Sequence, residues 1–400
     1  MNIAVAQSGG PTCAINATML GVFLGGTAHN DVDIVYGSRN GIEGLIYDNL
    51  INLNEAFAEK TTVDVVKQTP SAILGSCRYK LPDVKKDPAV YEAITATLQK
   101  HNIGAFFYIG GNDSMDTVVK LSRYFKKNNI DIRVIGVPKT VDNDLPFTDH
   151  TPGFGSAAKY VATTLREVVR DSNVYALKSV TVVEIMGRDT GWLTASTCLL
   201  RVCGETAPHL IYLPEASFST DRFIDDVKAK LEQHDSVVVA VSEGVEPENL
   251  SAFQSGKVDN FGHKYLSGVG KALESLINER IGCKVRSIEL NVMQRCASHV
   301  ASKRDWDEAI RIGKAAVTTA MKGQTGKMMT FVRKSDEPYR VTIGKTNAAN
   351  VANHVKYFPT EWINAEGNNV TDDALAYFLP LIQGEPKLLT ENGLPKHVIL

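Results

Sequence analysis

Residues 138–144 read Pro-Lys-Thr-Val-Asp-Asn-Asp and place a cation, a hydroxyl and two carboxylates close together in the chain. A carboxylate can take the proton of an alcohol, and a lysine can stabilise the charge of a phosphate. The alternative is a solvated turn, because proline, asparagine and aspartate all favour turns. The side chains that suit phosphoryl transfer to an alcohol are Lys139, Thr140, Asp142 and Asp144.

An apolar run at residues 132–137 directly precedes this stretch and predicts a buried parallel strand. Ligand sites in open α/β sheets lie where such strands end. Because the carboxyl ends of parallel strands meet at one edge of a sheet, we expect polar clusters at these ends to form a site. Six clusters follow predicted strands in this way, at residues 9–10, 110–114, 139–144, 186–188, 243 and 295.

Two of these clusters begin with paired glycines. Gly9 and Gly10 follow a short predicted strand, and Gly110 and Gly111 follow another. A glycine turn lets backbone N–H groups face an anion such as phosphate, although it can also be a plain strand-to-helix turn. Oxygen atoms of the next two residues can hold Mg2+ directly or through water, or can simply cap a helix. These two residues are Asn112 and Asp113.

Two other glycine patterns do not support a nucleotide site. Residues 153–158 contain Gly-x-Gly-x-x-Ala, but no apolar strand precedes them as a dinucleotide fingerprint requires. Residues 344–346 read Gly-Lys-Thr, but Tyr339 occupies the position that must be the first glycine of a P-loop. A dinucleotide-dependent oxidoreductase is therefore disfavoured.

The composition is that of an ordinary globular protein. The chain has 400 residues, 44% of them hydrophobic, and a formal net charge of −2, which argues against a nucleic-acid-binding protein. No apolar run is long enough to span a membrane, and the N-terminus does not resemble a signal peptide. Six scattered cysteines without a Cys-x-x-Cys pair are expected to be buried thiols in a reducing cytoplasm.

Repeated alternation of strands and helices predicts an α/β protein with two doubly wound, Rossmann-like domains and mainly parallel sheets. We place the active site in the cleft between them. One domain is expected to contain about residues 1–150 and a segment near 294–345, and the other about residues 151–293 and the C-terminal part. Residues 190–202 are predicted to form one continuous helix.

With these motifs in hand, the chain resembles the phosphofructokinase family over most of its length. The resemblance rests on seven motifs in the family's order: residues 8–10, 74–78, 110–111, 140–144, 186–188, 243–244 and 294–295. ATP-dependent members have glycines where this chain has Asp113 and Lys139, which is similar to the pyrophosphate-dependent branch. Asp113 would repel the α-phosphate of a nucleotide, and Lys139 adds charge beside a pyrophosphate.

The resemblance implies a reversible phosphoryl transfer from pyrophosphate to the 1-hydroxyl of D-fructose 6-phosphate, as in glycolysis and gluconeogenesis. It also implies Mg2+ as cofactor, a cytoplasmic location, and a homodimer or homotetramer in which a neighbouring subunit completes the sugar-phosphate site. The alternatives are an ATP-dependent enzyme, a kinase of a related phosphosugar, and a catalytically silent subunit that binds sugar phosphates. Asp142 and Arg188 disfavour the silent subunit because both are present.

The same resemblance assigns roles to residues. Asp142 is the expected general base, Thr140 positions the hydroxyl, and Asp144 orients the base or holds water around Mg2+. The residues expected to bind pyrophosphate are Gly9, Gly10, Arg78, Gly111, Ser114 and Lys139, with Asn112 and Asp113 at the metal and Asp113 also counted as catalytic. The residues expected to bind the sugar phosphate are Thr140, Val141, Asp142, Met186, Gly187, Arg188, Glu243, Arg286 and Arg295, where Arg188 also stabilises the transferred group.

Overall fold

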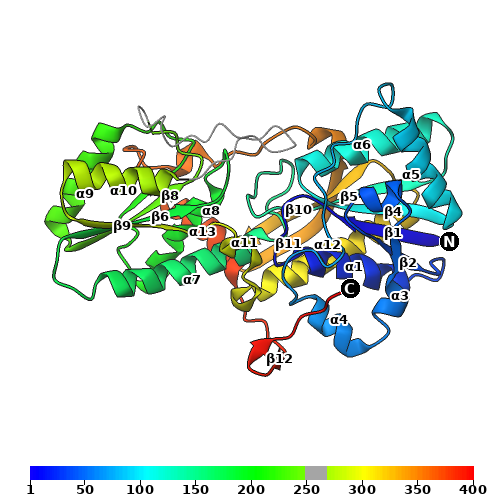
Figure 1. Cartoon of the computed structure of the whole chain (residues 1–400), viewed down its shortest axis with the longest axis horizontal. Coiled ribbons are helices and arrows are strands. Elements are labelled where there is room, and N and C mark those ends of the chain that lie inside the picture. The colour runs from blue at the N-terminus through cyan, green and yellow to red at the C-terminus, as the bar shows by residue number, and fades with distance from the viewer. Residues whose placement is uncertain (248–267) are drawn as a thin grey trace.

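The computed structural model describes residues 1–247 and 268–400 and has two lobes, each built on its own β-sheet (Figure 1). The larger lobe contains a seven-stranded sheet in the order β11-β10-β5-β4-β1-β2-β3. Neighbouring strands are parallel except in the β2–β3 and β10–β11 pairs. The strands are β1 (Asn2–Gln7), β2 (Val35–Ser38), β3 (Leu50–Asn52), β4 (Ile103–Gly110), β5 (Arg133–Pro138), β10 (Lys327–Asp336) and β11 (Tyr339–Asn347).

The smaller lobe contains a four-stranded, fully parallel sheet in the order β7-β8-β6-β9. Its strands are β6 (Ser179–Ile185), β7 (Leu210–Tyr212), β8 (Ser236–Ser242) and β9 (Lys284–Glu289). Valine and isoleucine dominate β6 and β8, as expected for strands that are buried on both faces. The helices of this lobe are α7 (Phe154–Ser172), α8 (Trp192–Ala195), α9 (Thr220–Gln233), α10 (Val269–Arg280), α11 (Met293–Cys296) and α13 (Asp372–Phe378).

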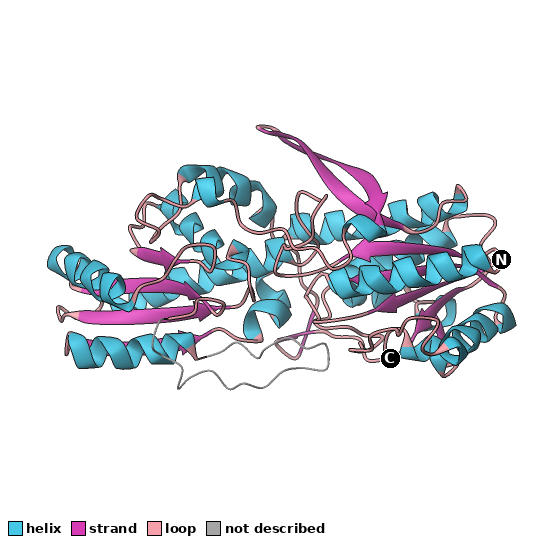
Figure 2. Ribbon diagram, turned by 90° about the horizontal axis from the view of Figure 1, so that it is seen from above, coloured by secondary structure: helices cyan, strands magenta, loops and turns pink. Residues whose placement is uncertain are grey.

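Helices cover both faces of each sheet, so the fold class predicted from the sequence is confirmed (Figure 2). On one face of the larger sheet, α1 and α12 pack so closely that a Cβ atom on Gly21 would lie 2.3 Å from the carbonyl oxygen of Ile310. The helices of the larger lobe are α1 (Ile15–Thr27), α2 (Glu43–Ile46), α3 (Leu53–Ala56), α4 (Lys60–Val66), α5 (Pro88–Lys100), α6 (Asn112–Lys127) and α12 (Lys303–Met321).

Two local predictions fail. Residues 190–202 form the short α8 followed by a 3-10 helix (Ser196–Cys203) instead of one continuous helix. The sequence analysis also did not predict α7, which begins inside the glycine-rich segment 153–158. Its first turn is stabilised from a distance, because the Asp305 carboxylate accepts hydrogen bonds from the backbone N–H groups of Gly153 and Ser156. A carboxylate far along the chain thus caps a helix that local sequence disfavours.

The cysteine prediction holds only in part. Cys13, Cys77 and Cys198 are buried free thiols, but Cys203 and Cys296 are exposed and Cys283 is partly exposed. Cys203 and Cys296 both end short helices at the protein surface, which explains their exposure. None of the described helices combines the length and the apolar character that a membrane span needs.

The last residues of the chain return to the larger lobe. Whereas α13 packs in the core of the smaller lobe, the Gln68 side chain donates to the carbonyl oxygens of Leu389 and Lys396. Val398 donates its backbone N–H to the Thr69 hydroxyl. The sequence analysis assigned the C-terminal part to one domain and did not anticipate this return.

Candidate active site

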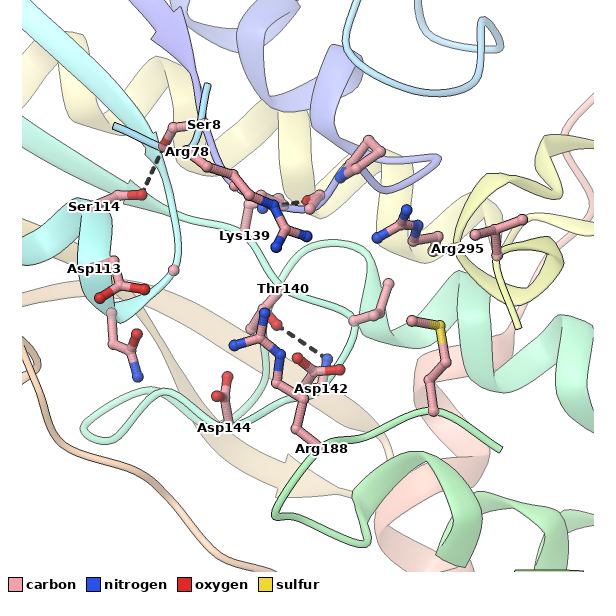
Figure 3. Close-up of a pocket in the computed structure, with 18 of the residues that line it drawn as sticks. Ser8, Arg78, Asp113, Ser114, Lys139, Thr140, Asp142, Asp144, Arg188 and Arg295 are labelled. Atoms are coloured by element: carbon pink, nitrogen blue, oxygen red, sulfur yellow. Dashed lines mark hydrogen bonds between the residues drawn. The ribbon is translucent and has the colours of Figure 1, made fainter. Parts of the chain in front are cut away.

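A cavity of about 450 Å³ lies where strands of both sheets end (Figure 3). The larger lobe lines it with residues that follow β1, β4 and β5, and the smaller lobe with residues at the ends of β6, β8 and β9. Carboxyl ends of parallel strands therefore face each other across one cleft, which is the usual place for a ligand in such sheets.

Every predicted site residue except Gly187 and Arg286 lines this cavity. The residues that the structure brings together are Gly9, Gly10, Arg78, Gly111, Asn112, Asp113, Ser114, Lys139, Thr140, Val141, Asp142, Asp144, Met186, Arg188, Glu243 and Arg295. Gly187 lies directly behind the cavity wall, where its backbone N–H donates to Glu243 Oε1 over 3.2 Å.

Arg286 does not line this cavity, so its predicted role in binding the 6-phosphate remains a prediction. It pairs with Thr181 in the middle of the β6–β9 ladder, three residues before β9 ends, and forms an ion pair with Asp171 at 3.5 Å. A residue in the middle of a strand cannot reach the edge where the strand ends, so Arg286 faces another surface of the smaller lobe.

Two threonine hydroxyl groups, of Thr140 and Thr151, hold the loop that carries Lys139 to Asp144. The Thr140 carbonyl oxygen accepts a hydrogen bond from Thr151 Oγ1 over 2.8 Å, and Thr140 Oγ1 accepts one from the backbone N–H of Asp142 over 3.1 Å. Because Thr140 Oγ1 acts as acceptor in this bond, its proton remains available for another partner. The Thr140 hydroxyl and the Asp142 carboxylate thus share one small region of the cavity.

Lys139 is buried against the first glycine turn. Its Nζ donates to the carbonyl oxygen of Gly10 over 2.6 Å, and a Cβ atom on Gly9 would lie 3.4 Å from this nitrogen. Burial lowers the pKa of Lys139 to about 8, although the Asp142 carboxylate opposes this shift. The ammonium group is therefore close to its own titration range at neutral pH and would be stabilised by an anion in the cavity.

Two carboxyl groups of the cavity have strongly raised pKa values. Burial and the neighbouring Asp142 charge raise the pKa of Asp144 to about 7. Burial also raises the pKa of Glu243 to about 7, even though its Oε1 accepts hydrogen bonds from the backbone N–H groups of Gly187 and Arg188. Perturbed titrating groups that converge in a cleft are typical of catalytic sites.

Glu243 also shapes the turn that carries Arg188. Arg188 has a left-handed backbone with a φ of 52°, and its N–H lies 2.9 Å from Glu243 Oε1. A non-glycine residue rarely adopts this conformation unless its surroundings hold it there. Glu243 was predicted to contact the sugar hydroxyls, and the structure adds that one of its oxygens organises the protein backbone.

Among the described residues, four cationic side chains line the cavity, and Arg295 borders both halves of it. Figure 3 shows Arg78, Lys139 and Arg295 along one side, with Arg188 reaching toward Thr140 and Asp142 from the other. A Cβ atom on Gly10 would lie 3.3 Å from Nη1 of Arg295. Burial, together with the Arg78 charge, lowers the pKa of Arg295, which favours an anionic ligand between these groups.

Close packing requires the first glycine of the second pair, Gly110, but not the second, Gly111. A Cβ atom on Gly110 would lie 2.0 Å from Ser114 Oγ and 2.4 Å from Ser8 Oγ, and these two hydroxyls share a hydrogen bond of 2.6 Å. A Cβ atom on Gly111 would lie 3.9 Å from the Lys139 carbonyl oxygen, an ordinary contact, and Gly111 occupies the N-cap of α6. Asp113 lies in the first turn of α6, where a negative charge also stabilises the helix, but it is not the N-cap residue.

Several cavity residues were missed by the sequence analysis. Glu184 and Glu289 lie at strand ends and could have been found by the rule that located the other clusters. Tyr108 lies inside β4, and no local signal distinguishes it from a core residue. The other cavity residues without a predicted role are Ser8, Pro11, Cys77, Tyr79, Thr117, Ile185, Asn291 and Val292.

Comparison with known proteins identifies the family. The phosphofructokinase family model matches residues 2–320. The chain is 40% identical to the pyrophosphate--fructose 6-phosphate 1-phosphotransferase of Methylococcus capsulatus and 41% identical to that of Xanthomonas campestris, in each case over 100% of this chain and 96% of the relative. A crystal structure of the pyrophosphate-dependent phosphofructokinase from Marinobacter aquaeolei superposes with a TM-score of 0.88 at 36% identity and covers 99% of this chain and 95% of the other. The chain belongs to the phosphofructokinase family.

Proposed function

We propose that this protein transfers a phosphoryl group from pyrophosphate to the 1-hydroxyl of D-fructose 6-phosphate and forms fructose 1,6-bisphosphate and phosphate. The observation that carries this proposal is the presence of Asp113 and buried Lys139 in one cavity with the Gly9–Gly10 turn. Relatives that match the whole chain at about 40% identity bear the name of this activity, which supports the same conclusion.

In the proposed mechanism, Asp142 takes the proton of the sugar 1-hydroxyl while the hydroxyl oxygen attacks a phosphorus atom of pyrophosphate. The new bond joins that oxygen to phosphorus, the bond to the bridging oxygen of pyrophosphate breaks, and phosphate leaves. Lys139, Arg78 and Arg188 stabilise the charge on the transferred group, and the Thr140 hydroxyl orients the attacking oxygen. The reaction is expected to run readily in both directions, because the phosphoanhydride of pyrophosphate lies closer in energy to the ester that is formed.

The two lobes are proposed to hold different substrates. The larger lobe offers the glycine turns, Arg78, Ser114 and Lys139 to pyrophosphate, and the smaller lobe offers Met186, Arg188 and Glu243 to the sugar. Asp113 lies in the first turn of α6, where a helix would otherwise attract the additional phosphates of a nucleotide. Its negative charge therefore disfavours ATP.

The cavity also fits Mg2+. Asn112 and Asp113 present an amide oxygen and a carboxylate, which are ligands that Mg2+ accepts. Among the described residues, no group of three His, Cys, Asp or Glu side chains could enclose a metal ion. This fits an ion that is bound by one or two protein oxygens and by the phosphates of the substrate, whose negative charge it would neutralise.

We further propose a homo-oligomer, a dimer or tetramer, in which Arg286 serves the sugar-phosphate site of a neighbouring subunit. Arg286 is about half-exposed and faces away from the cavity of its own chain, which supports a role across a subunit contact.

The absence of disulfides among the six cysteines supports a cytoplasmic location.

The proposed function is tested by offering the purified protein fructose 6-phosphate and Mg2+ together with either pyrophosphate or ATP. We expect fructose 1,6-bisphosphate from pyrophosphate and little or none from ATP. The control is Asp142→Asn, which leaves the cations in place and should abolish most turnover. Efficient use of ATP with no activity from pyrophosphate would refute the proposal.

A further inference from the structure

Lys356 lies behind the catalytic loop, outside the cavity, and directs its polar atoms to that loop. Its Nζ donates to the carbonyl oxygens of Asp149, over 2.8 Å, and of Thr148, over 3.2 Å. The same nitrogen lies 3.4 Å from Asn143 Oδ1. In addition, the backbone N–H of Lys356 donates to the carbonyl oxygen of Asp144 over 2.7 Å.

The same residue also contacts the segment that follows Arg188 in the smaller lobe. Its carbonyl oxygen accepts a hydrogen bond from Trp192 Nε1 over 2.9 Å, and its Nζ lies 4.8 Å from the centre of the indole ring. Two residues later, the backbone N–H of Phe358 donates to Glu215 Oε1, which also accepts from Gly191 over 2.9 Å. Residues 356–358 therefore link the loop of the general base to the segment that follows Arg188.

Asn143 shows why the loop needs this support. It lies between Asp142 and Asp144, is fully buried, and has a left-handed backbone with a φ of 56°. Its Nδ2 donates to the Tyr377 hydroxyl over 3.0 Å, while its Oδ1 faces Lys356. Since both polar atoms of this side chain are engaged away from the cavity, the two flanking carboxylates are left to line it.

Burial of an ammonium group is costly unless hydrogen bonds and charges compensate it. The charged groups that face Lys356 are Asp144 and Asp149 of the loop and Arg333 of β10, and burial lowers the pKa of Lys356 to about 8. A lysine that served stability alone could reach solvent at lower cost. Its ammonium group instead makes three hydrogen bonds to a single loop.

We propose that Lys356 is a positioning residue for phosphoryl transfer, which holds the loop of Asp142 and Asp144 in place relative to the turn of Arg188. The inference deepens the proposed function and rests on it for the identity of the reaction. Lys356 does not line the cavity and therefore does not touch a substrate. Its effect is expected on the geometry of the reacting groups, where a displacement of about 1 Å can cost roughly 100-fold in rate.

The test compares Lys356→Met, Lys356→Arg and a control, Lys159→Met. Lys159 is a buried lysine that also makes hydrogen bonds through its Nζ, 2.8 Å from the Gly384 carbonyl oxygen and 2.6 Å from Glu385, but it lies outside the cavity. We expect Lys356→Met to lower kcat by roughly 10- to 100-fold while KM for both substrates changes less than about threefold. Lys356→Arg should restore most of kcat, and Lys159→Met should keep the kcat of the wild type. Thermal melts of all variants show whether each is folded at the assay temperature.

A second measurement works even if the substrates are not those proposed. Hydrogen–deuterium exchange should be faster at residues 140–150 in Lys356→Met than in the wild type or in Lys159→Met. A wild type that is inactive with pyrophosphate would overturn the proposed function, and exchange would still test Lys356. The positioning role is overturned if the loop exchanges as in the wild type, if kcat is unchanged, or if only KM rises.

Discussion

The two walls of the cleft are built differently. The wall of the larger lobe takes most of its groups from turns that directly follow three adjacent strands of one sheet, and Lys139 binds the Gly10 carbonyl oxygen across two of these turns. The wall of the smaller lobe depends on support from elsewhere. One carboxylate oxygen of Glu243 accepts a hydrogen bond from the turn of Arg188, and Arg286 lies outside the cleft. The donor wall is thus built mainly from strand ends, with Arg78 added from the segment between α4 and α5, whereas the acceptor wall needs contacts from distant parts of the chain.

The largest effect is expected at the junction of the two walls, where Asp142 is the proposed base. Asp142→Asn keeps the size of the side chain but cannot take a proton, so kcat should fall by roughly 10²–10⁴-fold. Binding of fructose 6-phosphate, measured by calorimetry, should change little. If kcat stayed within a few-fold of the wild type, another group would have to act as base.

A smaller effect tests which wall Arg295 serves. Its guanidinium approaches Gly10 of the donor wall, although the family resemblance assigns it to the sugar phosphate. Arg295→Ala should raise KM for fructose 6-phosphate by about tenfold or more, because a charge-assisted hydrogen bond contributes roughly 1.5–3 kcal/mol. A selective rise in KM for pyrophosphate would instead move Arg295 to the donor wall. Steady-state kinetics with each substrate varied in turn separates the two results.

The smallest effect concerns pH. Asp144, with a pKa raised to about 7, loses its negative charge as pH falls, and Lys139, with a pKa lowered to about 8, loses its positive charge as pH rises. The value of kcat/KM for pyrophosphate, which reports the free enzyme, should therefore be highest between about pH 7 and pH 8 and fall several-fold on either side. Lys139→Arg should move the alkaline limb upward, since arginine stays charged. An alkaline limb that did not move would exclude Lys139 as its cause.

The sequence was sufficient for features that depend on local patterns. Apolar runs located strands, and strand ends together with the family resemblance pointed to sixteen residues that share one cavity. Features that depend on distant partners were not predictable in this way. The start of α7 requires Asp305, and the raised pKa values of Asp144 and Glu243 require burial in the folded chain and the nearby charge of Asp142. Arg286 was assigned to the sugar phosphate by resemblance, and the sequence did not show that its position three residues before the end of β9 keeps it out of the cavity of its own chain.

The most direct test of the donor wall is the ratio of kcat/KM for pyrophosphate to kcat/KM for ATP in the wild type, Asp113→Gly and Lys139→Gly. Removal of Asp113 deletes a repulsion in the first turn of α6, so Asp113→Gly should gain activity with ATP. Removal of Lys139 deletes a stabilising charge, so Lys139→Gly should lose activity with pyrophosphate and gain none with ATP. A double variant combines Asp113→Gly with Lys139→Gly. If ATP activity is unchanged in Asp113→Gly and also in this double variant, Asp113 does not select the donor, and the account of this wall is wrong.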